Sequence, residues 1–160
     1  MLCHFQSHLH SQKALCIQPD LSQIRFQDFW QDVIQQSQAI ESLVQDSWAL
    51  WEPDSYQFLV LLFAALLAKK QVLLPPHRVS DLEKELAEQN IYFLQRQPVA
   101  VSHNQPIQLN LDDAFLNQAQ IYFYTSGSTG QPKKIPRSLR QLLNEVQGLD
   151  ASFQLPEQAI

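Results

Sequence analysis

The sequence predicts an α/β fold in which βαβ units form a mostly parallel sheet flanked by helices. One observation supports the α/β class, and a second supports a single compact domain. Apolar, strand-like stretches alternate with stretches of helical length between residues 24 and 124. The chain also has 160 residues with 45% hydrophobic content, which suffices for one compact domain with its own core. We therefore treat residues 1–160 as a single unit.

The first helix is expected over residues 24–44. Apolar side chains from Phe26 to Val44 recur there at the spacing of one helix face, which gives the helix a core side. The stretch SWALW at 47–51 is bulky and alternating, and Pro53 follows it closely, so we expect a short strand.

A second helix is expected from Ser55 to about Lys69. The Asp54 carboxylate can accept from the free amides of its first turn, and Gln57 would complete an arrangement like a capping box. QVLLPP at 71–76 then forms a short apolar strand that prolines end. These elements make one strand, helix, strand unit.

The alternation continues toward the C-terminus. A helix is expected from Ser80 to Asn90, because its acidic residues come early and an asparagine stands near its end. Strands follow at 91–94, at 107–111 and, in the aromatic stretch QIYFY, at 120–124. The last helix is expected to be ended by Gly148.

Composition excludes several classes of function. The formal net charge of −5 gives no basic field for general nucleic-acid binding. The longest apolar run, at 58–68, is shorter than the roughly 20 residues of a membrane span. Cys3 and Cys16 follow neither zinc nor disulfide-framework spacing, and the polar N-terminus does not resemble a signal peptide. We therefore expect a cytoplasmic protein.

The most informative stretch is YFYTSGSTGQPKK at 122–134, which holds two of the three glycines in the chain. A strand runs into a loop of hydroxyl side chains and glycines, and glycines let backbone amides converge on an anion. Lys133 adds a compact positive charge close behind the loop. The combination suits a polyphosphate. The predicted phosphate-binding residues are Thr125, Ser126, Gly127, Ser128, Thr129, Gly130 and Lys133.

Three other interpretations of the loop are a Walker A loop, a dinucleotide-binding fingerprint and a solvated turn. It is not a Walker A loop, because Gly130 is followed by Gln131 and Pro132 rather than by Lys and a hydroxyl residue. It is not a dinucleotide-binding fingerprint either. A solvated turn is the ordinary explanation for Ser, Thr, Gly and Pro together. The full order, from aromatic strand to the Pro-Lys pair, favours the phosphate loop.

This order resembles the phosphate-binding signature of the adenylate-forming superfamily, which comprises acyl-CoA synthetases, peptide-synthetase adenylation domains and luciferases. Tyr124 to Lys133 match the family pattern, aromatic then T-S-G-[S/T]-T-G-x-P-K, at every fixed position. Lys134 stands where the family usually has glycine, and Leu139 where it often has His or Asn. The segment 54–75 looks like the N-terminal part of the same fold, so we expect this chain to be part of the larger domain of such an enzyme.

The resemblance implies a ligase reaction in two halves. A carboxylic acid attacks ATP to give an acyl-adenylate and pyrophosphate, and a thiol of coenzyme A or of a phosphopantetheine carrier then takes the acyl group. Mg²⁺ accompanies ATP. In this comparison the loop 125–130 and Lys133 hold the β- and γ-phosphates by position and charge. The resemblance does not indicate which carboxylic acid is activated or which thiol accepts the acyl group.

The chain stops at Ile160, whereas members of that family run to several hundred residues. The family's downstream aromatic-Gly-x-Thr-Glu motif, its ribose-binding Asp and its catalytic lysine are not in this sequence. We therefore expect an N-terminal portion that is inactive alone and that self-associates through exposed apolar surface. The alternative is a non-catalytic nucleotide-binding or partner-binding module with a vestigial phosphate loop.

Several residues are expected to be structural. A frayed polar N-terminus explains His4, His8 and His10 better than a metal site does. Asp112 and Asp113 are expected in a loop or helix cap, and the three tryptophans in the core or an interface. The arginines near the loop, Arg137 and Arg140, suit either a phosphate site or the solvated face of a helix.

Overall fold

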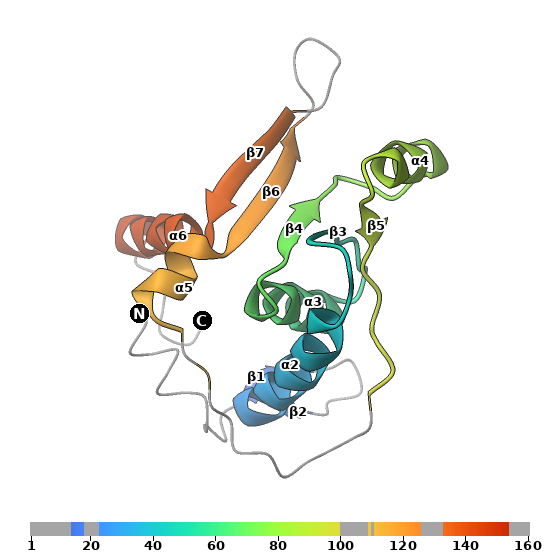
Figure 1. Ribbon diagram of the computed structural model, residues 1–160. Coiled ribbons are helices and arrows are strands. Elements are labelled where there is room, and N and C mark those ends of the chain that lie inside the picture. Colours follow the sequence, from blue (N-terminus) through green and yellow to red (C-terminus); the bar gives the residue numbers. More distant parts are fainter. Residues whose placement is uncertain (1–13, 18–22, 100–108, 110, 126–132, 154–160) are drawn as a thin grey trace.

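A computed structural model describes residues 14–17, 23–99, 109, 111–125 and 133–153 of the chain (Figure 1). Strands and helices alternate along it, as the sequence predicts. In chain order the elements are β1 (Ala14–Ile17), β2 (Gln23–Arg25), α2 (Phe26–Glu41), β3 (Ser47–Ala49), α3 (Ser55–Leu67), β4 (Gln71–Leu74), α4 (Ser80–Glu88), β5 (Tyr92–Phe93), α5 (Asp113–Gln118), β6 (Gln120–Thr125), β7 (Lys133–Ser138) and α6 (Leu139–Phe153).

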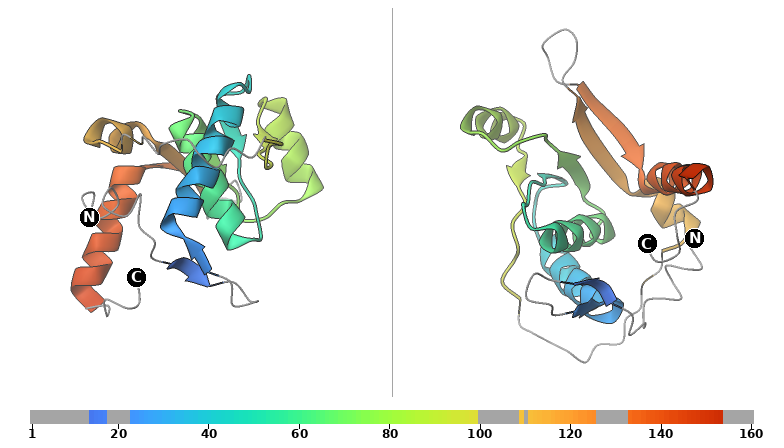
Figure 2. Two further views of the ribbon diagram at one scale, coloured as in Figure 1. Left: turned by 90° about the horizontal axis from the view of Figure 1, so that it is seen from below. Right: turned by 180° about the vertical axis from the view of Figure 1, so that it is seen from behind.

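The main sheet has five strands in the order β5-β3-β4-β6-β7. Strands β5, β3, β4 and β6 run parallel, and only β7 is antiparallel to its neighbour β6. Strands β1 and β2 form a separate antiparallel pair. Figure 2 shows the β6–β7 hairpin and α6 on one side of the molecule and α2 with α3 on another. The α/β class with a mostly parallel sheet is confirmed.

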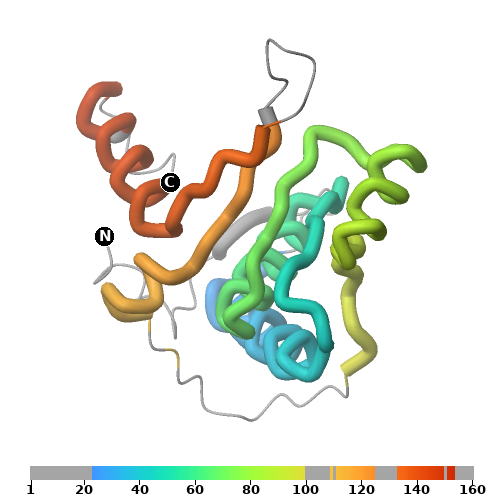
Figure 3. The backbone as a smooth tube through the Cα atoms, turned by 45° about the horizontal axis from the view of Figure 1, so that its top comes forward, coloured from blue at the N-terminus to red at the C-terminus, as the bar shows by residue number. Residues whose placement is uncertain are grey.

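The two faces of the sheet are covered by different helices (Figure 3). Alternate strand residues such as Trp48, Val72 and Ile121 join the main core, to which α2 and α3 contribute. Ala49 and Leu73 point the other way and pack with Leu86 and Ile91, from α4 and the residue before β5. The inner strands β3 and β4 therefore bury residues on both faces, which explains their largely apolar sequences.

Helix α2 packs along α3 through an aromatic cluster. Phe29 and Trp30 meet edge to face with ring centroids 5.0 Å apart, and Phe63 of α3 lies 5.4 Å from Trp30. Edge-to-face pairs of this kind stabilise a core beyond the area they bury. The helix expected over 24–44 is shorter than predicted, because β2 occupies its first residues and Val44, beyond its end, is 88% exposed.

The predicted N-terminus of α3 is confirmed in part. The Asp54 carboxylate accepts a hydrogen bond from the Gln57 backbone N–H at 2.7 Å, as an N-cap does. The reciprocal half of the capping box is wrong. Asp54 N–H donates to Glu52 instead, and the Gln57 side-chain oxygen accepts from Arg96 at 2.7 Å. A tertiary contact has displaced the local one.

Two further predictions differ from the structure, and one strand of the main sheet was not predicted. Helix α6 continues past Gly148 to Phe153. A methyl group added at Gly148 would meet nothing within 4 Å, so no neighbouring residue requires a glycine there. The strand expected at 107–111 is not formed at Leu109 or Leu111, and its other residues lie outside the described part. Strand β7 was not predicted, because its sequence KKIPRS contains three charges and a proline.

The side chain of Lys70 anchors the turn that follows α2. Lys70, which follows α3, has a side chain only 9% exposed and donates to the Leu43 carbonyl at 2.8 Å. Its ammonium also lies 3.9 Å from the Asp46 carboxylate, so it holds the turn between α2 and β3. Among the described residues, no helix is long and apolar enough to cross a membrane.

Candidate functional site

The predicted phosphate loop connects the two strands of the β6–β7 hairpin. β6 ends at Thr125 and β7 begins at Lys133, and these two residues pair across the ladder. Because β6 is parallel to β4, β3 and β5, the loop leaves at the carboxyl edge of the parallel strands. Ligands of open α/β sheets bind outside this edge. Ser126 to Gly130, five of the seven predicted site residues, lie outside the described residues.

Lys133 is exposed at the first position of β7. Its side chain forms no hydrogen bond or ion pair with any residue in the described part of the chain. Side chains alternate along a strand, so Lys133 belongs to the face of the hairpin that also carries Ile135 and Arg137. The described part of the chain therefore leaves the predicted phosphate-binding ammonium without a hydrogen-bond or ion-pair partner.

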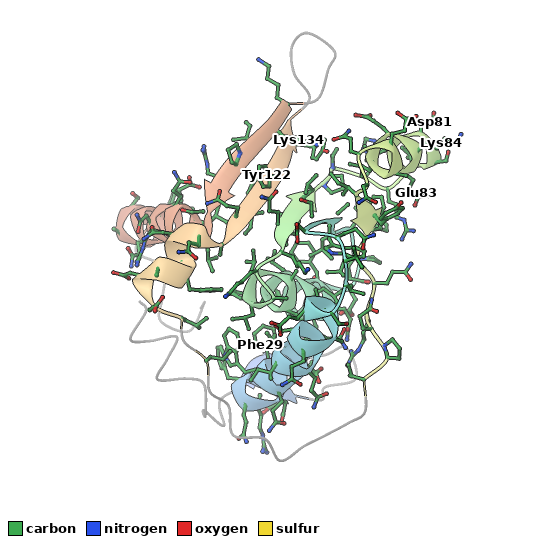
Figure 4. The ribbon with its side chains drawn as sticks, viewed as in Figure 1. Phe29, Asp81, Glu83, Lys84, Tyr122 and Lys134 are labelled. Carbon is green, nitrogen blue, oxygen red and sulfur yellow. The ribbon has the colours of Figure 1, made fainter. Side chains whose placement is uncertain are left out.

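Lys134 belongs to the opposite face. Its ammonium donates to the Gln89 side-chain oxygen at 2.7 Å, and it lies 5.8 Å from the centre of the Tyr124 ring. Figure 4 shows Lys134 on the side of the hairpin toward α4, whereas Lys84 projects from the far side of that helix. The residue that replaces the usual family glycine thus connects β7 to the residue that ends α4.

Tyr124 lies beneath this bridge. Its hydroxyl is buried and has no hydrogen-bond partner among the described residues. Burial raises the pKa of the Tyr124 hydroxyl above its ordinary value, and the negative charge of Glu85 on α4 raises it further. The phenol therefore stays protonated at neutral pH and contributes its ring face to Lys134.

The start of α6 explains the second departure from the family pattern. Ser138 N–H donates to the Gln141 side chain at 2.9 Å, and Gln141 N–H donates back to the Ser138 hydroxyl at 3.2 Å. This reciprocal capping box begins the helix. Leu139, which stands where His or Asn is often found, is 8% exposed and packs in the main core.

The two arginines after the loop form ion pairs. Arg137 lies 3.6 Å from the Glu145 carboxylate on α6, and Arg140 contacts the carboxylate of Asp113. Both pairs connect α6 to neighbouring elements, which favours the structural interpretation of these arginines. Asp112 caps α5 by accepting from the Phe115 N–H at 2.8 Å, which confirms the cap expected there.

No metal cluster is evident in the described ranges, where no three His, Cys, Asp or Glu side chains are arranged to hold an ion. The histidines at 4, 8 and 10 lie outside those ranges. The Lys134–Gln89 bridge was not predicted. The only signal for it was the lysine at a position where the family that the motif resembles usually has glycine, and nothing in the sequence indicates its partner 45 residues away.

Comparison with known proteins identifies the fold. No protein-family model matches the sequence. No curated protein matches it. O-succinylbenzoate coenzyme A synthetase (MenE) from Bacillus subtilis, solved with AMP, matches with a TM-score of 0.67 and 14% identity, over 96% of this chain and 46% of that one. The same synthetase has also been solved with ATP and a magnesium ion.

Two further solved structures are similar. MatB from Rhodopseudomonas palustris matches with a TM-score of 0.64 and 15% identity, over 94% of this chain and 37% of that one. Fatty acyl-adenylate ligase from L. pneumophila, solved with acyl adenylate and pyrophosphate, gives 0.60 and 18%, over 95% and 32%. This chain has the α/β fold of adenylate-forming enzymes, as its motif predicts. It spans less than half the length of these proteins.

Proposed function

We propose that this chain is the ATP-phosphate-binding portion of an AMP-forming acid–thiol ligase. The complete protein would activate a carboxylic acid as an acyl-adenylate and then transfer the acyl group to the thiol of coenzyme A or of a carrier protein. The chain would form the N-terminal portion of the large domain. By itself it would not complete the reaction.

One observation carries the proposal. The signature T-S-G-S-T-G-Q-P-K joins two strands at the carboxyl edge of a parallel sheet, in a chain whose fold is that of adenylate-forming enzymes. The structural neighbours share only 14% to 18% identity with this chain, so the likeness in fold supports the proposal beside the match of the signature. A solvated turn would account for the residue types of this segment but not for their match to the full signature in this fold.

The chemistry follows from charge and position. Attack of a carboxylate on the α-phosphorus of ATP expels pyrophosphate, so a group that neutralises the β- and γ-phosphates makes the leaving group more stable. Lys133, exposed and without a partner in the described residues, supplies such a charge. We assign Mg²⁺ to the nucleotide phosphates, where it shares this role.

The reaction is tested with a protein that continues through the remainder of such a domain. Carboxylate-dependent exchange of labelled pyrophosphate into ATP measures the adenylation half-reaction alone. We expect exchange with at least one acid of a panel of aliphatic, aryl and amino acids, and its loss in Lys133→Ala. Binding of ATP without exchange on any acid would instead support a non-catalytic nucleotide-binding module.

A further inference from the structure

Two adjacent lysines follow the predicted loop, and the structure gives them different environments. Lys133 is exposed without a partner in the described part, whereas the ammonium of Lys134 has one partner on α4 and one on β6. We propose that Lys134 is a positioning residue, which holds β7 against α4 and so fixes the face on which Lys133 meets the phosphates of a nucleotide. This inference rests on the proposed function.

The hairpin needs such a fastening because β7 is the edge strand of the sheet. On one side it has the ladder to β6, and on its other side no strand of the described residues pairs with it. Pro136 within β7 lacks an N–H, so the strand offers one donor fewer to any pairing. A strand held by one ladder has fewer hydrogen bonds to fix its orientation than an inner strand has, and a side chain that reaches another element adds a further restraint.

The hydrogen bond from Lys134 to Gln89 joins the sheet to the helix layer, whereas backbone hydrogen bonds join only neighbouring strands within the sheet. Gln89 ends α4, which packs over Ala49 of β3 and Leu73 of β4. A bond from Lys134 to Gln89 therefore connects the edge of the sheet to a helix seated on its centre. The Tyr124 ring below the ammonium narrows the directions in which the lysine can extend.

The alternation of side chains transmits the position of Lys134 to Lys133. The two residues are consecutive in β7, so their side chains point to opposite faces of the hairpin. Any rotation of β7 about its axis moves both side chains together. A bridge that fixes Lys134 on the α4 face therefore presents Lys133 on the other face, where no described residue pairs with its charge.

The test is a double-mutant cycle on the purified chain. Lys134→Met keeps the aliphatic stem and removes the donor, and Gln89→Leu removes the acceptor. Without nucleotide, each change should raise amide exchange of residues 133–138 by about three- to tenfold, and the double variant should raise it no further, because both remove one bridge. Lys134→Arg should restore protection. Additive effects, or none, would overturn the bridge.

MgATP binding then separates positioning from direct contact. We expect Lys134→Met, Gln89→Leu and the double variant to weaken ATP binding by the same factor of about three to ten, with unchanged dependence on salt. The inference would be overturned if Lys134→Met bound ATP more weakly and with a reduced dependence on salt while Gln89→Leu bound ATP as the unaltered chain does. That result would show that Lys134 itself contacts phosphate. Failure of the unaltered chain to bind ATP would refute the proposed function, whereas amide exchange would still report on the bridge.

Discussion

The side chain of Gln36 forms two hydrogen bonds with the backbone of Gln97, 61 residues later. Its oxygen accepts from the Gln97 N–H at 2.8 Å, and its nitrogen donates to the Gln97 carbonyl at 3.0 Å. Gln36 is fully buried on α2, the only buried polar residue among those described. The pair attaches the chain that leaves β5 to the helix layer.

Replacement of Gln36 by Leu is expected to destabilise the protein by about 2–4 kcal/mol, because it leaves both the N–H and the carbonyl of Gln97 without partners. Urea denaturation measures the change. Gln38→Leu is the matched control, since Gln38 is exposed on the same helix. Equal stability of the two variants would show that water replaces the lost bonds.

The N-cap of α3 gives a second prediction. Asp54→Ala should lower the free energy of unfolding by about 1 kcal/mol, because the Gln57 N–H loses its acceptor. In a domain of this size that is a fall in Tm of roughly 2–4 °C. Asp54→Asn keeps an acceptor oxygen and should stay close to the unaltered protein. A loss as large in Asn as in Ala would implicate the charge and not the hydrogen bond.

Tyr56 gives a pH-dependent prediction. Burial raises the pKa of its hydroxyl above the ordinary value, and so does the Asp32 carboxylate, to which the hydroxyl donates at 3.0 Å. The folded state therefore keeps a proton that the unfolded chain releases above about pH 10, and stability should fall as the pH rises through this range. Tyr56→Phe removes this ionisation.

Denaturation curves between pH 8 and 11 test the Tyr56 prediction. Stability of Tyr56→Phe should fall less steeply with pH than that of the unaltered protein, although the variant starts lower because it lacks the bond to Asp32. Parallel curves for Tyr56→Phe and the unaltered protein would contradict the raised pKa.

Helix α6 carries exposed apolar side chains at Val146, Leu149 and Phe153, with exposed fractions of 50%, 54% and 71%. Their spacing places them on one side of the helix. We expect the purified chain to self-associate through this stripe, and Leu149→Lys with Phe153→Lys to make it monomeric in sedimentation analysis. A monomeric unaltered chain at high concentration would contradict this expectation.

The elements that the sequence predicts well are those with a local cause. Asp54 before an apolar run gives the start of α3, and the aromatic stretch before Thr125 gives β6. Each depends on neighbours within a few residues. The phosphate loop was predicted in the same way, from the order of consecutive residues, and most of it lies outside the described part of the chain.

The elements that were missed depend on distant partners. Strand β7 has an unfavourable composition and forms because β6 provides a ladder and because an edge position tolerates Pro136. Gln57 leaves its local cap for Arg96, 39 residues away. Gly148 does not end α6, because a single glycine costs a helix only about 1 kcal/mol and the helix continues through it.

Calorimetric titration of MgATP into the purified chain, beside Lys133→Ala, tests the central claim most directly. Lys84→Ala is the control, because Lys84 is a paired, exposed lysine on the far side of α4 (Figure 4). We predict that the unaltered chain and Lys84→Ala bind ATP alike and that Lys133→Ala binds roughly ten- to a hundredfold more weakly. Equal binding by all three, or binding by none, would contradict a phosphate-binding role for this hairpin.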